Sequence, residues 1–240
     1  MNSKDVSADR AVDAAYEGMR ARYGPKNSRA NGYIYEGYFL NEQRTLFSLL
    51  DPRADTLVDV GCGSGLMVLP IANNRKNIVG IDFNSHAVRA AYDNGLPVIR
   101  GDAFDLPFGD ATIDEIVCCQ FFNQQSADAV RQFIAESART LRPEGRLIMV
   151  WRNGESCVHR LALSLFGTIE HMRGFEQFPY VSHSFSKIEA YAANHDLNLV
   201  AQMVSFPPTG WSSPKIDSWK ARLFGASNIC VVEKRGLIDE

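Results

Sequence analysis

The sequence has few cysteines, and none of them has the spacing that holds a metal ion. Five cysteines occur among 240 residues, and no two of them form the short paired spacing of a zinc site. Reduced thiols in a cytoplasmic protein are the preferred interpretation, and no metal is expected. The start, Met1 to Asp5, has no apolar segment of the kind found in a secretory signal.

Long apolar runs and an excess of basic charge are also missing. No apolar run approaches the length needed to cross a bilayer, so we expect no membrane span. The 25 Lys and Arg residues are balanced by 28 Asp and Glu residues, giving a net charge of −3. This balance argues against broad electrostatic binding to nucleic acid. The length fits one α/β domain with some elaboration, and no feature indicates an oligomeric state.

The most informative stretch is a glycine-rich turn after a short apolar run. A short, mainly apolar run that ends in Val58-Asp59-Val60 leads directly to Gly61, Gly63 and Gly65, and a helical pattern follows at once. Glycine permits a tight turn and leaves room for a closely bound ligand. A following helix would offer unpaired N–H groups, although Pro70 predicts a kink or an early end. The stretch therefore predicts a site for a nucleotide-like ligand.

Strand and helix patterns alternate after this turn. The predicted strands are residues 56–61, 77–82, 97–100, 113–119, 146–151, 197–206 and 227–233. The alternation predicts an α/β fold with a mainly parallel sheet and helices on both faces. The last two strands have no helical pattern between them, which predicts an antiparallel pair at the sheet edge.

The remaining segments surround this core. Residues 8–23 and 40–50 predict two helices before the turn. The helices predicted after it are one capped by Asn84 or Ser85 and ending near Asn94-Gly95, one capped by Ser126, one at residues 158–171, and one capped by Ser184 or Ser186 and ending at His195. Residues 142–145 predict a turn into the strand that follows. We expect a single domain over residues 1–240. Its predicted parts are a helical lead-in and lid at 1–50, a cofactor-binding core at 56–151, an acceptor-site insertion at 152–183, and a C-terminal helix and strand pair at 184–240.

Asp82 ends the second predicted strand, 21 residues after Gly61. An acidic side chain there can accept hydrogen bonds from both hydroxyls of a ribose. The alternative is an ordinary turn or cap aspartate, because residues 82–85 are typical of a turn. The distance from the glycines favours the ribose role, although this pair alone would also suit a dinucleotide.

Four segments in order resemble the class I S-adenosylmethionine-dependent methyltransferases, in the type 11 small-molecule branch. They are Val-Asp-Val-Gly-Cys-Gly-Ser-Gly (58–65), Gly-Ile-Asp (80–82), Gly-Asp-Ala-Phe-Asp-Leu-Pro-Phe (101–108) and Leu-Arg-Pro-Glu-Gly-Arg-Leu (141–147). The resemblance covers about residues 56–151. It implies a Rossmann-like sheet of seven strands, S-adenosylmethionine as cofactor, and methyl transfer to a small-molecule acceptor.

The resemblance also implies roles for individual residues. The methionine part of the cofactor would be bound by Asp59, Gly61, Cys62, Gly63 and Gly65. The ribose and adenine would be bound by Asp82, Phe83, Asp102, Ala103 and Phe104. Cys119 and Gln120 would border the reacting methyl group. Family members often carry histidines just beyond this point, whereas this chain has Gln120, Asn123 and Gln124.

No catalytic residue is identified by the sequence. A sulfonium already carries an activated methyl group, so the protein mainly aligns the reactants and excludes water, and a base is needed only for a protonated acceptor. The candidates for a base are His159, His171, His183 and Tyr38. Each histidine could equally be a surface or core residue.

Two aromatic groups could border the site. Tyr33, Tyr35, Tyr38 and Phe39 lie near Gly32 and Gly37 and could form a lid, or could pack against the sheet. Trp151, at the end of a predicted strand, could form part of the cavity wall.

Two other functions fit parts of the pattern. A nicotinamide-dependent oxidoreductase could use a similar sheet, but Leu66 stands where the dinucleotide pattern has its later glycine. A non-catalytic homologue that only binds the cofactor is the second alternative, because the histidines near residues 120–124 are missing.

Overall fold

The computed structural model describes most of the chain. The described residues are 14, 17–24, 26–33, 36–72, 77–157, 160–161, 164–165, 168, 181–206, 211–213 and 224–236. The helices are η1 (Ser28–Asn31), α2 (Glu36–Leu49), α3 (Leu69–Ala72), α4 (Ser85–Asn94), η2 (Phe121–Gln124), α5 (Ala127–Thr140) and α7 (Phe185–Ala193). The strands are β1 (Thr56–Val60), β2 (Asn77–Asp82), β3 (Val98–Arg100), β4 (Ile113–Cys119), β5 (Leu141–Arg152), β6 (Leu197–Phe206), β7 (Trp211–Ser213) and β8 (Ser227–Lys234).

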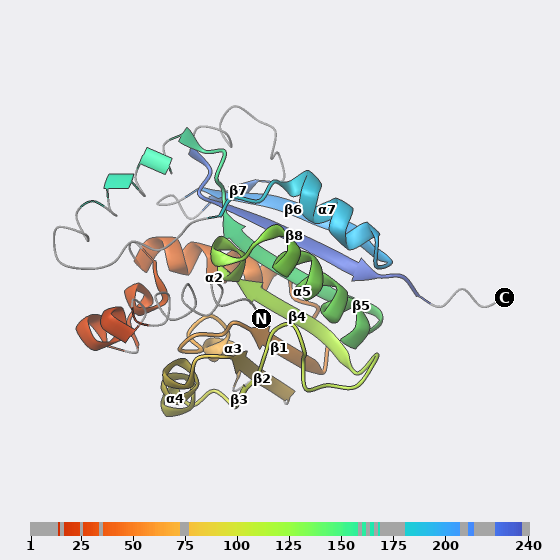
Figure 1. The fold of residues 1–240 in the computed structure, drawn as a ribbon, viewed down its shortest axis with the longest axis horizontal. Helices are drawn as coiled ribbons and strands as arrows, with labels where there is room; N and C mark the ends of the chain where they lie inside the picture. Colours follow the sequence, from red (N-terminus) through yellow and green to blue (C-terminus); the bar gives the residue numbers. More distant parts are fainter. Residues whose placement is uncertain are drawn as a thin grey trace.

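The strands form one sheet in the order β3-β2-β1-β4-β5-β8-β6-β7 (Figure 1). The strands from β1 to β5 pair in parallel, while β8 pairs antiparallel with both β5 and β6. This confirms the predicted Rossmann-like sheet with its antiparallel C-terminal pair. β8 lies inside the sheet because it pairs with β5 on one side and β6 on the other, and the three-residue strand β7 extends the sheet beyond β6.

Helices cover both faces because the buried strands are apolar on both sides. Ile116 and Cys118 of β4 pack into the cluster that includes α5 and α7. Val117 belongs to the cluster on the other face, together with residues of α2 and α4, and Cys119 packs against that cluster. Successive strand residues point to opposite faces, so the adjacent cysteines face opposite ways. Figure 1 shows α5 and α7 side by side over one face.

Polar caps begin the helices that frame the site. Asn84 accepts a hydrogen bond from the Ala87 amide at 2.8 Å, and Ser126 accepts one from the Ala129 amide at 3.2 Å. Gly95 closes α4 in the left-handed conformation, with φ of 95°. The predicted starts of these two helices and the end of α4 are confirmed.

The segment after the glycine turn differs from the prediction. Residues 61–68 form turns, and α3 contains only four residues. The glycines explain this, because Gly61, Gly63 and Gly65 have φ of 70°, 57° and 77°, which a right-handed helix excludes. The expected helix N-terminus therefore does not lie at the turn. Pro70 lies in the first turn of α3, where proline is tolerated, so the kink or early end predicted there stays a prediction.

Two other boundaries differ from the predicted ones. Strand β5 begins at Leu141 instead of residue 146, because Ile113 pairs with Leu141 before the register shifts to Glu115 with Arg146. The predicted turn at residues 142–145 thus lies within β5 as an irregularity of the strand. Helix α2 begins at Glu36 rather than at residue 40.

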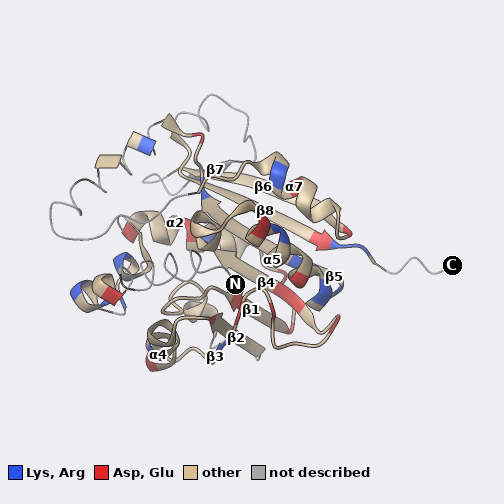
Figure 2. Cartoon of the chain, in the orientation of Figure 1, with Lys and Arg blue, Asp and Glu red and all other residues tan. Residues whose placement is uncertain are grey.

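The described surface carries both signs of charge. Figure 2 shows acidic and basic residues together on α4, α5 and α7. In the described part of the chain, no helix is both long and apolar enough to span a membrane.

Candidate functional site

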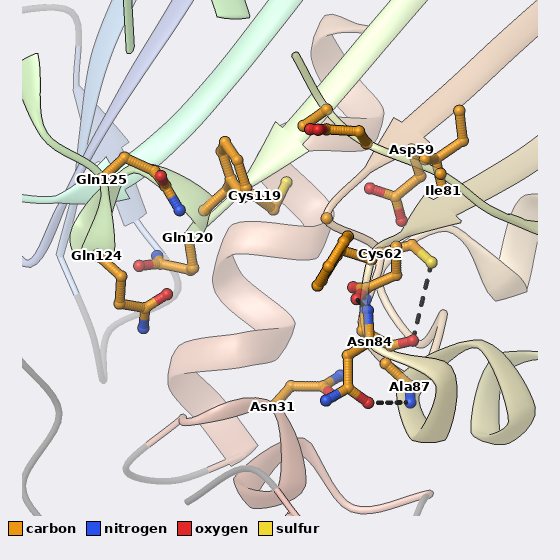
Figure 3. Close-up of a pocket in the computed structure, with 18 of the residues that line it drawn as sticks. Asn31, Asp59, Cys62, Ile81, Asn84, Ala87, Cys119, Gln120, Gln124 and Gln125 are labelled. Atoms are coloured by element: carbon orange, nitrogen blue, oxygen red, sulfur yellow. Dashed lines mark hydrogen bonds between the residues drawn. The ribbon is translucent and has the colours of Figure 1, made fainter. Parts of the chain in front are cut away.

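A cavity of about 640 Å³ opens at the carboxyl ends of β1, β2 and β4 (Figure 3). Ligands of open α/β sheets bind in such crevices, and the volume lies within the usual range for small-molecule sites, roughly 300–1,000 Å³. Every residue predicted to bind the cofactor lines this cavity, except Gly65. We call the following residues the strand-end wall: Asp59, Gly61, Cys62, Gly63, Asp82, Phe83, Asp102, Ala103, Phe104 and Cys119.

The three glycines of the turn have different surroundings. A Cβ on Gly61 would lie 3.0 Å from the Phe121 ring, and one on Gly63 would lie 3.1 Å from Asn31 Oδ1. A Cβ on Gly65 would lie 2.8 Å from Leu96 Cδ2, away from the cavity. Gly65 thus lets the turn pack beside the end of α4, and it does not border the cavity as predicted.

Asp82 is held at the end of β2 by two backbone amides. Its Oδ2 accepts from the Gly63 amide and its Oδ1 from the Asn84 amide, both at 2.9 Å. Each carboxylate oxygen has two acceptor sites, so these bonds leave capacity for hydroxyl donors of a ligand. The cap of α4 is Asn84, so Asp82 is not needed for that role.

Asp59 is buried beneath the turn, with 1% of its surface exposed. Among the described residues, its Oδ2 atom has no hydrogen-bond partner. Burial, followed by the charge of Asp82, raises the pKa of Asp59 to about 7. A buried acceptor that borders the cavity fits the ammonium of a bound amino-acid group.

The other end of the strand-end wall is aromatic. Phe83 is 55% exposed, and Arg100 lies over its ring at 5.7 Å from the centroid. Asp102 accepts a hydrogen bond from the Phe104 amide at 2.9 Å, which orders the loop after β3. Phe104 packs against Phe121 with ring centroids 6.0 Å apart. This end is suited to a flat ring.

The sequence did not predict most of the facing side of the cavity. We call its residues the opposite wall: Arg20, Asn31, Tyr33, Phe39, Gln120, Phe121, Gln124, Gln125, Ser126, Asp128, Ala129 and Gln132. Only Gln120 was predicted to bind the cofactor. Figure 3 shows Gln120, Gln124 and Gln125 across the cavity from Asp59 and Cys62. One link between the walls is the hydrogen bond from Ser64 Oγ to Asn31 Oδ1, at 2.8 Å.

The polar residues after β4 are bound to protein partners. Gln120 has a left-handed backbone with φ of 63°, uncommon for a residue other than glycine. Its amide donates to Glu42, and its Oε1 accepts from Asn123 Nδ2 at 2.6 Å. Asn123 in turn accepts from the Arg152 amide at 3.0 Å. This network holds the segment where relatives often carry histidine.

Among the residues considered for a base or a lid, Tyr33 and Phe39 line the cavity, whereas Tyr38 and His183 do not. Tyr38 is 2% exposed, does not line the cavity, and bonds through its hydroxyl to Ser227. His183 is buried against the carbonyls of Phe122 and Gln125, at 3.2 and 3.1 Å, and burial lowers its pKa. His159 and His171 lie outside the described residues, as does Tyr35.

Trp151 was wrongly expected to form a cavity wall. It is fully buried, and its Nε1 donates to the His183 carbonyl at 2.8 Å. It packs against the rings of Phe185 and Phe122, at 5.0 and 6.3 Å. Its position near the end of β5 places it between the sheet and α7 instead.

Three buried cysteines lie in or beside the site. Burial raises the pKa values of Cys62, Cys118 and Cys119 well above the usual range, so these thiols stay protonated at neutral pH. No group of three metal-ligating side chains occurs within the described ranges.

Comparisons with known proteins agree with this geometry. A family model described as "Methyltransferase domain" matches residues 58–149. Residues 58–149 belong to the class I S-adenosylmethionine-dependent methyltransferases. The resemblance drawn from the four motifs is thereby confirmed, and S-adenosylmethionine is the cofactor of this family.

The chain is similar to several methyltransferases. It is 29% identical over 99 residues to a demethylmenaquinone methyltransferase of Corynebacterium kroppenstedtii, covering 41% of this chain and 42% of that protein. It is 34% identical over 124 residues to nocamycin O-methyltransferase of Saccharothrix syringae, covering 46% and 42%. The chain thus spans less than half of these relatives' length.

A solved structure extends the likeness to the fold of most of the chain. It is a S-adenosylmethionine-dependent methyltransferase of Thermotoga maritima, described as a possible histamine N-methyltransferase. The TM-score is 0.64 at 18% identity, with 82% of this chain and 89% of that chain covered.

Proposed function

We propose that the protein transfers a methyl group from S-adenosylmethionine to a small-molecule acceptor. The observation that carries this proposal is the strand-end wall, which brings the glycine turn, Asp82 and Asp102 to one cavity. When bound, the cofactor supplies an electrophilic methyl group on a cationic sulfur. The protein's part is to bind both reactants, align them and exclude water.

The residues of the strand-end wall fit the parts of this cofactor. Asp59 would accept from the ammonium, and Asp82 from the ribose hydroxyls. Phe83 and Phe104 would flank the adenine, and Asp102 would accept from its amino group. These roles follow from the side-chain chemistry and from the family pattern.

The charge of the cavity disfavours the nicotinamide alternative. Its charged lining residues are Arg20, Asp59, Asp82, Asp102 and Asp128. A dinucleotide carries a negative pyrophosphate, which usually binds at a helix N-terminus directly after the glycine turn. Here α3 begins only at Leu69, and acidic side chains predominate. A ligand with a sulfonium and an ammonium suits this lining better.

The opposite wall would bind the acceptor. Its amides Gln124, Gln125 and Gln132 offer both hydrogen-bond donors and acceptors. The named relatives act on a demethylmenaquinone and on nocamycin, both small molecules, which supports an acceptor of this class. The predicted acceptor-site insertion at 152–183 stays a prediction, since much of it lies outside the described residues.

The non-catalytic alternative has one observation in its favour. Gln120 and Asn123 are bonded to protein partners, and Tyr38 lies outside the cavity. An acceptor that is already nucleophilic at neutral pH needs no base, so this observation is compatible with catalysis.

Calorimetry and a transfer assay test the proposal. We expect the protein to bind S-adenosylmethionine and S-adenosylhomocysteine at one site, and to bind NAD weakly or not at all. Tight binding of NAD without binding of S-adenosylmethionine would contradict the proposal. Radiolabelled methyl transfer to any member of a panel of small phenols, quinols and amines would exclude the non-catalytic alternative.

A further inference from the structure

Glu42 is a fully buried carboxylate directly behind the opposite wall. It lies on α2, is 0% exposed and does not line the cavity. The Tyr33 hydroxyl donates to its Oε2 at 2.7 Å, and Gln120 Nε2 donates to both of its oxygens, at 2.8 and 2.9 Å. The Ser227 hydroxyl donates to Oε1. Donors from the lead-in, from the segment after β4 and from β8 thus converge on one carboxylate.

These donors are neutral, so they stabilise a negative charge without cancelling it. Hydrogen bonds to a carboxylate favour its ionised form, whereas burial favours the protonated form. The pKa of Glu42 is raised above its ordinary value, because burial outweighs the bonds from Ser227, Gln120, Tyr33 and Tyr38, which act in the opposite direction. The hydrogen bonds to both carboxylate oxygens stabilise the ionised form within this buried site.

The network reaches the cavity at two points. Tyr33 and Gln120 each donate to Glu42 and also line the cavity. Burial raises the pKa of Cys119, which lies next to Gln120, and the charges of Asp59 and Glu42 raise it further. One end of the cavity therefore lies between Asp59 on β1 and Glu42 on α2. Fields in a cleft with apolar walls are screened less than in bulk water.

We propose that Glu42 is a charge-selecting and positioning residue that, through Tyr33 and Gln120, makes this end of the cavity prefer a cationic sulfonium over a neutral thioether. The inference rests on the proposed function and deepens it. Methyl transfer breaks the bond between the sulfonium sulfur and the methyl carbon and forms the bond to the acceptor. The sulfur keeps the electron pair and becomes neutral, and the positive charge leaves with the acceptor or its proton. Glu42 thus distinguishes the substrate cofactor from its product.

Calorimetry with two ligands tests this proposal without an acceptor. S-adenosylmethionine and S-adenosylhomocysteine are titrated at neutral pH into the full chain and into Glu42→Gln, which keeps the side-chain size. We expect the ratio of their affinities to shift about tenfold against S-adenosylmethionine, with the affinity for S-adenosylhomocysteine within about twofold of the original. Glu36→Gln removes the same charge from the exposed start of α2 and should leave the ratio unchanged.

A second variant guards against misfolding of the first. Ser227→Ala removes one donor to Glu42 without changing the cavity lining, and should shift the same ratio by about threefold. Thermal melting establishes that each variant is folded. An equal loss of affinity for both ligands, or an unchanged ratio of the two affinities in a folded variant, would overturn the proposal. If the unmodified protein binds neither ligand, the proposed function fails instead.

Discussion

The strand-end wall and the opposite wall enclose one cavity, yet they are built differently. The strand-end wall comes from the ends of neighbouring parallel strands and the turns that follow them. The opposite wall comes from the lead-in and from η2 and α5, and the lead-in lies far from the other two in the sequence. The first is held by the ladders of the sheet, and the second by side-chain bonds such as those of Glu42 and Asn31. The proposed cofactor site thus depends on the backbone of the sheet, and the proposed acceptor site depends on side-chain contacts between distant segments.

The largest expected effect concerns the buried acid of the strand-end wall. In the folded protein, the pKa of Asp59 is about 7, against an ordinary value of 3.8. Because this pKa is raised, Asp59 contributes stability that is complete below its unfolded pKa and is lost as pH rises through about 7. The loss amounts to up to about 4 kcal/mol.

Asp59→Asn should remove this dependence. Its free energy of unfolding in urea, relative to the unmodified protein, should rise between about pH 4 and pH 8. Asp93→Asn, at an exposed position of α4, serves as the control. A difference between Asp59→Asn and the unmodified protein that is constant with pH would disprove the assignment.

A variant of Gly65 tests whether this glycine is needed for packing of the fold, whereas Gly61 and Gly63 border the cavity. Gly65→Ala adds a Cβ at positive φ and forces Leu96 to move, which should lower the free energy of unfolding by about 2–3 kcal/mol. Gly95→Ala has a similar φ with nothing within 4 Å and should cost about 1 kcal/mol. Chemical denaturation measures both. Equal losses of stability in the two variants would show that close packing of Gly65 beside the end of α4 does not add to the cost of the substitution.

Variants of Asp82 and Asp128 compare how the strand-end wall and the opposite wall contribute to cofactor binding. Asp82→Ala should weaken binding of S-adenosylhomocysteine by about 10–100-fold, since charge-assisted hydrogen bonds contribute about 1.5–3 kcal/mol. Asp128→Ala, on the opposite wall, should change this affinity by less than about threefold. Calorimetry compares the two. Unchanged binding by Asp82→Ala would refute the ribose role.

The smallest expected effect concerns the stability of α5, which forms part of the opposite wall. Ser126→Ala removes the side-chain cap of α5 and should cost about 1 kcal/mol of stability. Ser184 begins α7 without a side-chain cap bond, so Ser184→Ala should cost less than about 0.5 kcal/mol. Thermal melting distinguishes them. A larger loss for Ser184→Ala would contradict this account of the caps.

The core elements were predictable because their signals are local. Strand β4 agrees with its predicted bounds, as does β2, because each is a short apolar run between turn residues. The helix starts at Asn84 and Ser126 were predicted from single capping residues. The helix expected directly after the turn was wrong, because periodicity in residues 66–72 does not reveal that three glycines have positive φ.

The positions of two aromatic residues could not be predicted from their neighbours in the sequence, because distant segments bury them. Trp151 follows the apolar run of β5, and its neighbours could not indicate that α7 covers it. Tyr38 lies beside two glycines that suggested a lid, yet its hydroxyl bonds to Ser227, 189 residues away. Glu42 gave no signal, since a glutamate in a helical pattern is usually solvated.

The sequence by itself determined the parallel sheet, the order of its elements and the strand-end wall. Those features depend on apolar periodicity, on glycines and on acidic residues at the ends of strands, all of which lie within short stretches of chain. Only the tertiary structure decided the opposite wall, the separate role of Gly65 and the burial of Glu42. These depend on which distant segments meet, since burial away from water raises the pKa of Glu42 while donors from three segments act in the opposite direction.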